Sequence, residues 1–377
     1  MRGNELAGWL RLTLTPGVGP DTARRLLAAF GLPEAVLAQP LGALRQVVSD
    51  AQAKALATPP PDFDTQLAAT EAWLDGAADR RIWGLADADY PAALLRTEDP
   101  PLLLYAVGSG LSDGTLTDPA LAIVGSRNPT PQGCANAQAF AGSFAQAGLV
   151  VVSGMALGID GEAHTGALDA GGRTIAVVGT GLDRVYPKRH LGLAHRIAAN
   201  GLVVSELPLG TPPLAHNFPR RNRIIAALSQ GTLVVEAALQ SGSLITARLA
   251  LEQGKEVFAI PGSIHAPQSR GCHALIKQGA KLVESAQDVL EELRWPGSAG
   301  IAPESIAKSL DSTRAEGQNG LKNAVLEALG HDPASLDVLM ARTGLDAAHL
   351  QGQLLELELA DQVARLPGGL FQRIGRG

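Results

Sequence analysis

Four short stretches of small residues, one of them ending in an arginine, have the composition of anion-binding loops. They comprise Gly125–Arg127, Ser153–Ala156, Gly179 with Gly181, and Ser241–Ser243. Glycine and serine leave backbone N–H groups accessible, and a helix that begins just after such a loop adds a partial positive charge. The stretches therefore predict a site for a phosphate group, which could belong to a nucleotide cofactor or to a nucleic-acid backbone.

A cationic stretch lies between His216 and Ile224. It contains Phe218, Arg220, Arg221, Asn222 and Arg223. Guanidinium groups bind phosphate oxygens through paired hydrogen bonds, and an aromatic ring can stack on a base. We expect at least one of these arginines to contact the ligand. The alternative is that one or two of them pair with Glu206 or Glu236 and orient the loops.

The first glycine loop lacks the pattern of a dinucleotide-binding site. Such a site needs Gly-x-Gly-x-x-Gly after the first strand and an acidic residue at the end of the second strand. Here the first turn reads Gly-Ser-Arg-Asn-Pro-Thr from Gly125, and the second apolar run ends in Ser-Gly-Met. The chain also lacks the Gly-x-x-x-x-Gly-Lys-Ser/Thr loop of P-loop ATPases. These absences favour a polyanionic strand, and no cofactor is expected.

Asp160 and His164 lie four positions apart and could share one face of a helix, as two ligands of a metal site do. No third ligand follows at a suitable spacing. We therefore expect structural roles for both residues, such as helix capping, and no metal. The two cysteines, Cys134 and Cys272, are too few for a metal cluster and are expected to be small buried or half-buried residues.

The glycine loops follow regularly spaced apolar runs, which predict the elements that position them. These runs are Leu121–Val124, Leu149–Val152, Thr174–Val178, Leu202–Val204, Thr232–Val235 and Val257–Ile260. Short apolar runs that alternate with helical stretches are typical of a parallel sheet covered on both faces. We predict an α/β, doubly wound, Rossmann-like domain over residues 116–295. Its loops should meet at the carboxyl ends of the strands, where such sheets bind ligands.

The flanking segments predict two smaller domains. Residues 1–85 have the pattern of a small all-α domain of the SAM or helix-hairpin-helix type. Its turn at Pro16–Gly19 could offer N–H groups to a DNA phosphate, and a plain helical turn explains the pattern equally well. Residues 86–115 are rich in proline and are predicted to be an extended connector, and residues 296–319 a flexible linker. Residues 320–377 have the element order of a winged helix.

Charge restricts where nucleic acid could bind. The formal net charge is −6, so binding requires a local patch. The third predicted helix of the winged helix, residues 346–360, has no Lys or Arg. We therefore expect a protein-contact or regulatory module, with DNA contacts restricted to Arg365, Arg373 and Arg376. No apolar stretch approaches the length of a membrane span and the start lacks a signal-peptide pattern, so a cytoplasmic protein is expected.

The order of motifs in the middle of the chain resembles the DNA-processing protein A (DprA/Smf) family. The matching segments include AIVGSRNPT, VVSGMALGIDGEAHTGAL, NFPRRNRIIAALS and VVEAALQSGSLITARLALEQGKEVFAIPG. The resemblance implies a protein without enzymatic activity that binds and protects incoming single-stranded DNA during natural transformation. It also implies loading of the RecA recombinase and action as a homodimer.

The resemblance further implies which residues form the DNA pocket. They are Gly125, Ser126, Arg127, Ser153, Gly154, Met155, Ala156, Gly179, Gly181, Phe218, Arg220, Asn222, Arg223, Ser241, Gly242 and Ser243. Many relatives have a lysine just before the Phe-Pro pair, whereas this chain has Ala215, His216 and Asn217 there. Arg221 or His216 is expected to replace that contact.

The predicted Rossmann-like domain also resembles, distantly, the lysine-decarboxylase-like (LOG) nucleotide phosphoribohydrolases. Their Gly-Gly-x-Gly-Thr-x-x-Glu loop ends in a catalytic glutamate. Alignment of Gly242 and Ser243 with its Gly-Thr places Thr246 at that position, so the carboxylate is missing. For the dimer contact we expect the apolar residues Ile276 and Leu282, although core packing explains two such residues equally well.

Overall fold

The N-terminal part of the chain is helical. The computed structural model describes residues 1–296, 325–326, 328–330 and 333–374. Helices α2 and α3 begin at a proline, which is preset for the first helical turn, and α5 begins with a capping box formed by Ser49 and Gln52. The helices are α1 (Gly3–Leu14), α2 (Pro20–Phe30), α3 (Pro33–Leu37), α4 (Leu41–Leu44), α5 (Asp50–Ala57) and α6 (Phe63–Asp75).

A nine-stranded sheet in the order β1-β2-β6-β5-β4-β3-β7-β8-β9 forms the middle of the described molecule. Each pair of adjacent strands in the part β6-β5-β4-β3-β7-β8-β9 is parallel, which confirms the predicted doubly wound α/β fold. The six predicted apolar runs form β3 to β8. The strands are β1 (Arg80–Gly84), β2 (Leu103–Val107), β3 (Ala120–Val124), β4 (Val150–Ser153), β5 (Thr174–Val177), β6 (Gly201–Ser205), β7 (Gly231–Val234), β8 (Glu256–Ala259) and β9 (Lys281–Leu282).

The segment predicted to be an extended connector, residues 86–115, instead contributes to the sheet. Its strand β2 pairs antiparallel with β6 and with β1, and a short helix, α7 (Ala92–Leu95), lies between β1 and β2. Strand β2 is a short apolar run whose first four residues are buried, and Pro100 and Pro101 lie just before it, separated from it by Leu102. In the sequence these prolines suggest that regular structure is interrupted. In the structure they lie just before the strand, where proline is tolerated.

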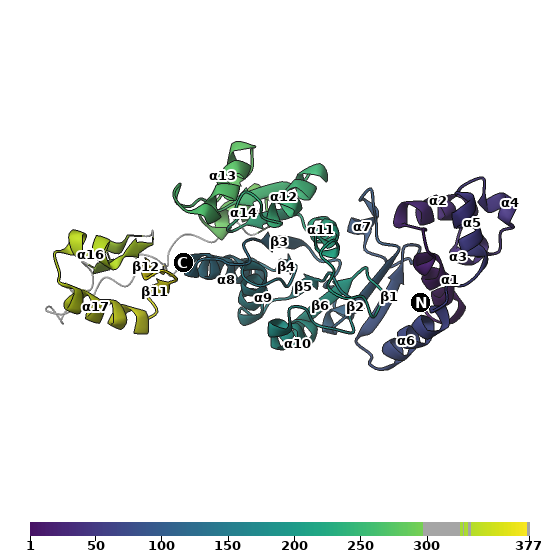
Figure 1. Cartoon of the computed structure of the whole chain (residues 1–377), viewed down its shortest axis with the longest axis horizontal. Coiled ribbons are helices and arrows are strands. Elements are labelled where there is room, and N and C mark those ends of the chain that lie inside the picture. Colours follow the sequence, from purple (N-terminus) through teal and green to yellow (C-terminus); the bar gives the residue numbers. More distant parts are fainter. Residues whose placement is uncertain (297–324, 327, 331–332, 375–377) are drawn as a thin grey trace.

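Helices cover both faces of the sheet (Figure 1). Val124 and Val177 face the side covered by α11, α12 and α13, whereas Ile123 and Val151 face the side covered by α8, α9 and α14. Helix α10 packs against β5 and β6. Neighbouring residues of a strand point to opposite faces, so strands of this kind are apolar throughout. The helices are α8 (Pro131–Gln146), α9 (Ile159–Asp169), α10 (Leu191–Asn200), α11 (Asn217–Leu228), α12 (Ser243–Glu252), α13 (Arg270–Lys277) and α14 (Ala286–Glu292).

The N-terminal helices share a hydrophobic core with the antiparallel end of the sheet. Trp9 and Leu26 belong to the same buried cluster as Ile82 of β1 and Tyr105 of β2. The turn at Pro16–Gly19 lies between α1 and α2, as predicted, and Gln52 of α5 donates a hydrogen bond to its Gly17 carbonyl oxygen (2.8 Å). This turn is thereby held against α5.

The C-terminal region has the predicted winged-helix elements. Two helices, α16 (Leu336–Thr343) and α17 (Ala347–Leu359), accompany a sheet in the order β10-β12-β11, formed by Ala334–Ser335, Leu370–Arg373 and Val363–Leu366. The predicted linker, except residue 296, and Arg376 lie outside the described residues, as does much of the first predicted helix. Among the helices that the structure describes, none has the length and apolarity to cross a membrane.

Candidate nucleic-acid interface

Two adjoining cavities lie at the carboxyl ends of the parallel strands. The larger, which we call the main pocket, has a volume of about 410 Å³, and the smaller, the side cavity, about 110 Å³. Both are lined by Arg127, Ala156, Phe218 and Arg221. Of the other predicted residues, the main pocket has Gly125, Ser126, Asn222, Ser241, Gly242 and Ser243, and the side cavity has Gly154, Met155 and Gly179.

Arg127 is the exposed cation of the main pocket. Its guanidinium carbon lies 5.8 Å from the ring centroid of Phe218, over the ring face, and within the described residues it forms no ion pair. The Asn128 amide donates to Ser126 Oγ (3.1 Å), which fixes the turn that carries the arginine. Arg127 is therefore available to an anionic ligand while its side chain is oriented by an aromatic neighbour.

Glycines allow the first two loops to approach each other closely. A Cβ on Gly125 would lie 2.7 Å from Ile159 Cγ1, and a side chain on Gly158, whose φ is +79°, would overlap with the Ser126 carbonyl oxygen. The Ile159 amide donates to that same carbonyl (3.1 Å). Larger residues at Gly125 or Gly158 would push apart the loops that carry Arg127 and Ala156.

The start of α12 completes the opposite wall of the main pocket. Ser241 Oγ and Ser243 Oγ are hydrogen-bonded (2.7 Å), and Asn222 Nδ2 donates to the Gly242 carbonyl oxygen (3.3 Å). Asn222 thus ties α11 to the helix mouth. The wall presents hydroxyl groups and the N-terminus of a ten-residue helix to the pocket, both of which suit a phosphate.

Arg221 lies inside the protein and forms part of the pocket wall. Its Nη1 donates to the carbonyl oxygens of Gly154 and Val177, its Nε donates to Asn222 Oδ1 (3.0 Å), and its Nη2 lies 3.8 Å from Asp160 Oδ2. Burial raises the pKa of Asp160, and the Arg221 guanidinium opposes that rise. The residue predicted to bind DNA is therefore also the structural link between the ends of β4 and β5.

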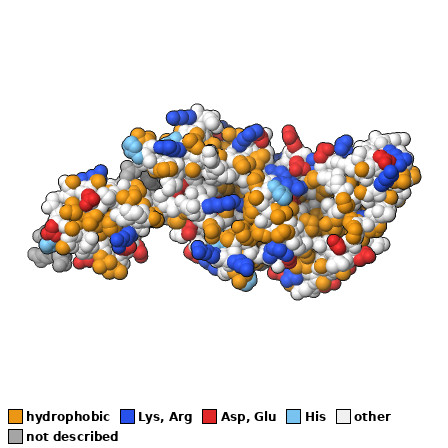
Figure 2. Space-filling view, viewed as in Figure 1, with side chains coloured by type: hydrophobic (Ala, Val, Ile, Leu, Met, Phe, Trp, Pro, Cys, Tyr) orange, Lys and Arg blue, Asp and Glu red, His pale blue; other side chains and the backbone are white. Residues whose placement is uncertain are grey.

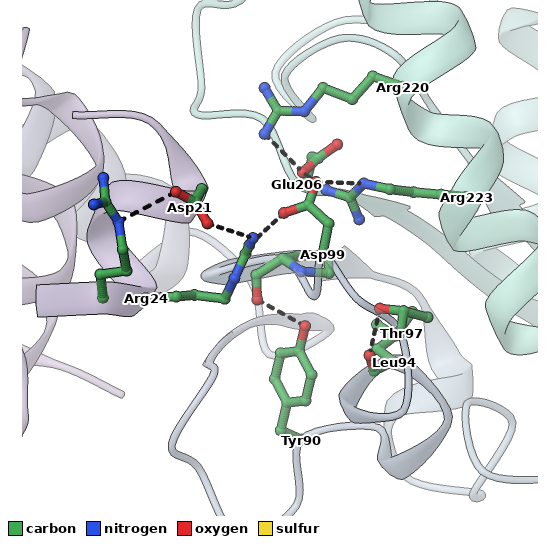
Figure 3. Close-up of polar contacts among 11 residues, drawn as sticks. Asp21, Arg24, Tyr90, Leu94, Thr97, Asp99, Glu206, Arg220 and Arg223 are labelled. Atoms are coloured by element: carbon green, nitrogen blue, oxygen red, sulfur yellow. Dashed lines mark hydrogen bonds and ion pairs between the residues drawn. The ribbon is translucent and has the colours of Figure 1, made fainter. Parts of the chain in front are cut away.

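Arg220 and Arg223 face Glu206 rather than the two cavities (Figure 3). Glu206 Oε2 accepts from Arg223 Nη2 and from Arg220 Nη2 (3.2 Å), and its side chain is only 5% exposed. Burial raises the pKa of Glu206, and the two guanidiniums oppose the rise. These contacts correspond to the alternative in which two arginines pair with Glu206. The other candidate, Glu236, accepts instead from the backbone and hydroxyl of Thr130.

The charges around Glu206 extend to the N-terminal helices. Asp99 lies between Arg223, whose Nε is 3.3 Å from Asp99 Oδ2, and Arg24 of α2. Asp21 lies on the other side of Arg24 (3.9 Å), as Figure 3 shows. We call Arg24, Asp99, Glu206, Arg220 and Arg223 the Glu206 cluster. In the space-filling view, a group of Lys and Arg side chains gathers between the sheet and the N-terminal helices (Figure 2).

Several other predicted residues have surroundings that explain their type. Ser153 is buried and donates to the Ile123 carbonyl oxygen (2.6 Å), and Gly181 packs against Pro208; neither lines the main pocket or the side cavity. Asp160 accepts from the Ala156 amide (3.3 Å) before the first turn of α9. His164 is buried beside Thr174 (2.7 Å between Nδ1 and Oγ1), and burial lowers its pKa to about 3. Both side chains are buried and hydrogen-bonded within the protein, and Asp160 also lines the main pocket.

The segment just before Phe218, residues 215–217, lines neither of the two cavities. Asn217 is buried and its Nδ2 donates to the Gly179 carbonyl oxygen (3.3 Å), whereas His216 is exposed just before α11. Asn217 therefore positions α11 against the third glycine loop.

The two residues predicted for a dimer contact differ in exposure. Leu282 is 51% exposed on strand β9 at the end of the sheet, whereas Ile276 packs partly against the core.

Sequence reasoning missed the side-cavity residues Leu157, Thr180, Tyr186 and Pro187, and Gln240 of the main pocket. Tyr186 and Pro187 belong to a segment, GLDRVYP, that follows the third glycine loop. An aromatic residue a few positions after a ligand-binding loop is a signal that could have identified Tyr186. Thr246, which stands where a phosphoribohydrolase would have glutamate, lines the main pocket and is 1% exposed.

The chain matches two family models. Residues 81–294 match the model of DNA recombination-mediator protein A, and residues 311–369 match the DprA winged helix domain. Protein Smf of Escherichia coli is 45% identical over 281 residues, which cover 74% of each chain. DNA processing protein DprA of Streptococcus pneumoniae is 47% identical over 213 residues, or 56% of this chain and 74% of that protein.

Solved structures agree with these matches. The X-ray structure of DNA processing protein A from Streptococcus pneumoniae is 38% identical and has a TM-score of 0.62, covering 78% of this chain and 99% of that one. A structure of DNA processing protein A from Helicobacter pylori, described as revealing its single-stranded DNA binding mode, is 34% identical with a TM-score of 0.51. It covers 57% of this chain and 96% of that one. The sequence matches, the sheet topology and the winged helix together place this chain in the DprA/Smf family of DNA-processing proteins.

Proposed function

We propose that this protein binds single-stranded DNA without catalysis and without base-specific contacts to most nucleotides. The observation that carries the proposal is the exposed Arg127 guanidinium beside Phe218, at a pocket whose walls include glycine loops and the N-terminus of α12. Such a site holds phosphates through charge and backbone N–H groups and a base through stacking. The Helicobacter pylori relative, whose structure concerns single-stranded DNA binding, supports the same ligand.

A titration with a fluorescent dT oligomer tests the proposal. If about three phosphates are neutralised, affinity should fall about twentyfold between 50 and 200 mM salt, because bound counterions are released. An Asp99→Asn variant, which changes a charge outside both cavities, serves as a matched control. Absence of oligomer binding at low salt would refute the proposal.

The alternative activity, hydrolysis of a nucleoside monophosphate, is tested in the same preparation. Thr246 has no carboxylate to assist cleavage of a glycosidic bond, so incubation with AMP should release no adenine. Release of adenine that a Thr246→Val variant abolishes would contradict a non-enzymatic protein.

We further propose that the protein protects incoming DNA and loads the RecA recombinase during natural transformation, acting as a homodimer in the cytoplasm. The family resemblance supports these roles, and the exposed Leu282 on the end strand β9 supports a contact between two sheets. A Leu282→Glu variant should sediment as a monomer. A strand-exchange assay with RecA and single-strand-binding protein should show faster RecA assembly with the wild type than with Arg127→Ala.

A further inference from the structure

Another cavity lies at the opposite end of the parallel strands from the main pocket. It has a volume of about 470 Å³ and is bordered by residues that precede β3, β7 and β8 and by the end of α11. Residues 93, 96 and 97, in and after α7, form a further wall, and α7 lies beside α11 (Figure 1). We call this space the amino-end cavity. Open parallel sheets bind ligands at the carboxyl ends of their strands, so its position sets it apart from the nucleic-acid site.

Two cations line the amino-end cavity, and neither forms an ion pair within the part of the chain that the structure describes. They are Arg96, which is exposed, and Lys255, which is half-buried. The pKa of Lys255 is lowered to about 8, chiefly by burial and also by the positive charge of Arg96. The acidic lining residue, Asp118, pairs instead with Arg173, with 2.6 Å between its Oδ2 and Arg173 Nη2. The two neighbouring cations therefore attract an anion from outside the chain.

Both cations keep hydrogen-bond donors that no protein group uses. Lys255 Nζ donates to the carbonyl oxygens of Ala226 (2.7 Å) and Ala227 (2.6 Å) at the end of α11. An ammonium group has three N–H donors, so one remains for a ligand. Arg96 Nε lies 3.4 Å from the Ala92 carbonyl oxygen, and its two Nη groups have no partner within the described residues. The cavity thus offers an ammonium proton and the end of a guanidinium to an anion.

Several neutral polar groups of the cavity accept hydrogen bonds rather than donate them. The hydroxyls of Thr97, Thr117 and Ser229 donate to backbone carbonyl oxygens of the protein at 2.7–2.9 Å. A hydroxyl has one proton, so each of the three can only accept from a ligand. Gln253 Oε1 is a buried acceptor with no partner among the described residues. A ligand that suits these walls has hydroxyl donors as well as a negative charge.

We propose that the amino-end cavity binds a small sugar phosphate, with its phosphate at Arg96 and Lys255 and a sugar hydroxyl donating to Gln253 Oε1. A phosphate monoester carries a charge of about −2 near neutral pH, which matches two cations. The volume of about 470 Å³ is within the usual range of small-molecule sites. This site goes beyond the proposed binding of DNA and does not depend on it, because it shares no lining residue with the main pocket or the side cavity.

Calorimetric titration with ribose 5-phosphate, ribose and inorganic phosphate tests the proposal. The wild type should bind ribose 5-phosphate, bind inorganic phosphate more weakly, and show no heat with ribose at the same concentration. Arg96→Gln removes a charge-assisted contact and should weaken ribose 5-phosphate binding about tenfold or more. Gln253→Leu removes the acceptor and should weaken binding of ribose 5-phosphate but not of inorganic phosphate. Arg248→Gln, a change at an exposed arginine of α12 that lines none of the three cavities, is the matched control and should bind as the wild type does.

The nucleic-acid site needs a separate control, because it also suits a phosphate. Arg127→Ala should bind ribose 5-phosphate with the wild-type affinity while it binds a dT oligomer more weakly. If Arg127→Ala loses ribose 5-phosphate instead, the sugar phosphate occupies the main pocket, and the proposal fails while DNA binding stands. Absence of binding to the wild type, or displacement of ribose 5-phosphate from Arg127→Ala by the dT oligomer, would also refute it.

Two further results would contradict the assigned contacts. Arg96 and Arg248 are both exposed, so the melting temperatures of the two glutamine variants should match that of the wild type. Equal losses of ribose 5-phosphate affinity in these two variants would show attraction to surface charge in general and overturn the proposal. Equal affinities of the wild type for ribose 5-phosphate and inorganic phosphate would overturn it too, because the sugar would then contribute nothing.

Discussion

Arg127 and the arginines of the Glu206 cluster lie on neighbouring parts of the same sheet edge, yet their surroundings are opposite. Arg127 is exposed and lies over an aromatic ring, whereas Arg223 is 11% exposed in its side chain and contacts two carboxylates. One guanidinium is free for a ligand, and the other holds α11 to the loop after β6. Arginines at one sheet edge can therefore have different roles, one in ligand binding and another in holding the fold together. The presence of carboxylates next to the guanidinium distinguishes the two roles.

The largest effect is expected at Arg221, the most buried of these arginines. Arg221→Met leaves Asp160 unpaired and the Gly154 and Val177 carbonyls without their donor. Loss of one partner from a buried pair costs about 3–5 kcal/mol, so the free energy of unfolding should fall by that amount in urea denaturation. Arg220→Met removes an arginine that is 39% exposed and leaves Glu206 paired with Arg223, so it should cost less than about 1 kcal/mol. Equal losses would show that burial does not separate the two arginines.

Acid should weaken the same buried region through His164. Burial lowers its pKa to about 3 in the folded protein, with smaller contributions from His190 and Arg221, against about 6.5 when unfolded. Between these values the unfolded chain binds the proton and the folded chain does not, so stability falls as pH falls. The loss approaches about 1.4 kcal/mol per pH unit below the unfolded pKa, and it amounts to about 2 kcal/mol from pH 6.5 to 4.5.

Urea titrations across this range, with the wild type and His164→Asn, measure that loss. The asparagine has no proton to gain, so its stability should change less with pH than that of the wild type. Parallel pH profiles for the two proteins would rule out His164 as the source.

Alanine substitutions at Arg127 and at Arg223 test the comparison directly, because the first should affect DNA binding and the second should affect stability. Arg127→Ala should weaken dT oligomer binding by about 1–3 kcal/mol and lower the salt dependence by about one phosphate contact, with stability unchanged. Arg223→Ala should instead lower the free energy of unfolding by about 2 kcal/mol, because Glu206 keeps only Arg220, and change DNA affinity less than Arg127→Ala does. The reverse pattern would make Arg223 the DNA contact.

Much of this arrangement could be predicted from the sequence. The strands from β3 to β8 are apolar runs at regular spacing, and the loops after them carry the glycines and Arg127. In a parallel sheet these loops must meet at one edge, so the pocket follows from the order of the elements.

The rest depends on tertiary distances that the sequence does not contain. From the sequence, Glu206 and Glu236 are equally good ion-pair partners for the arginines. In the structure Arg223 pairs with Glu206, because α11 lies next to the loop that carries Glu206. Strand β2 is a short apolar run that follows two prolines, and its pairing with β6 depends on the tertiary fold. Tyr186 reaches Phe218 only because two loops separated by about 30 residues lie side by side.

The smallest effect is expected where the Glu206 cluster reaches α2. Asp99 is 40% exposed in its side chain, so Asp99→Asn should lower stability by only about 0.2–1 kcal/mol. Thermal unfolding at low and high salt measures this loss of stability, and the variant and the wild type should be equally stable at high salt. A larger, salt-insensitive loss would mean that Asp99 belongs with the buried group rather than with the exposed one.

The pairing of β1 with β2 determines how this protein can be shortened. The two strands lie on either side of residue 85, so a deletion there would divide a hairpin rather than remove a separate domain. Removal of the helices alone would also expose Ile82, Leu103 and Tyr105, which they cover. An apolar surface next to an open strand edge promotes aggregation. The N-terminal helices thus act as the cover of the sheet's antiparallel end, and a shortened protein that keeps the pocket needs residues 80–107 together with a polar replacement for the face those helices now bury.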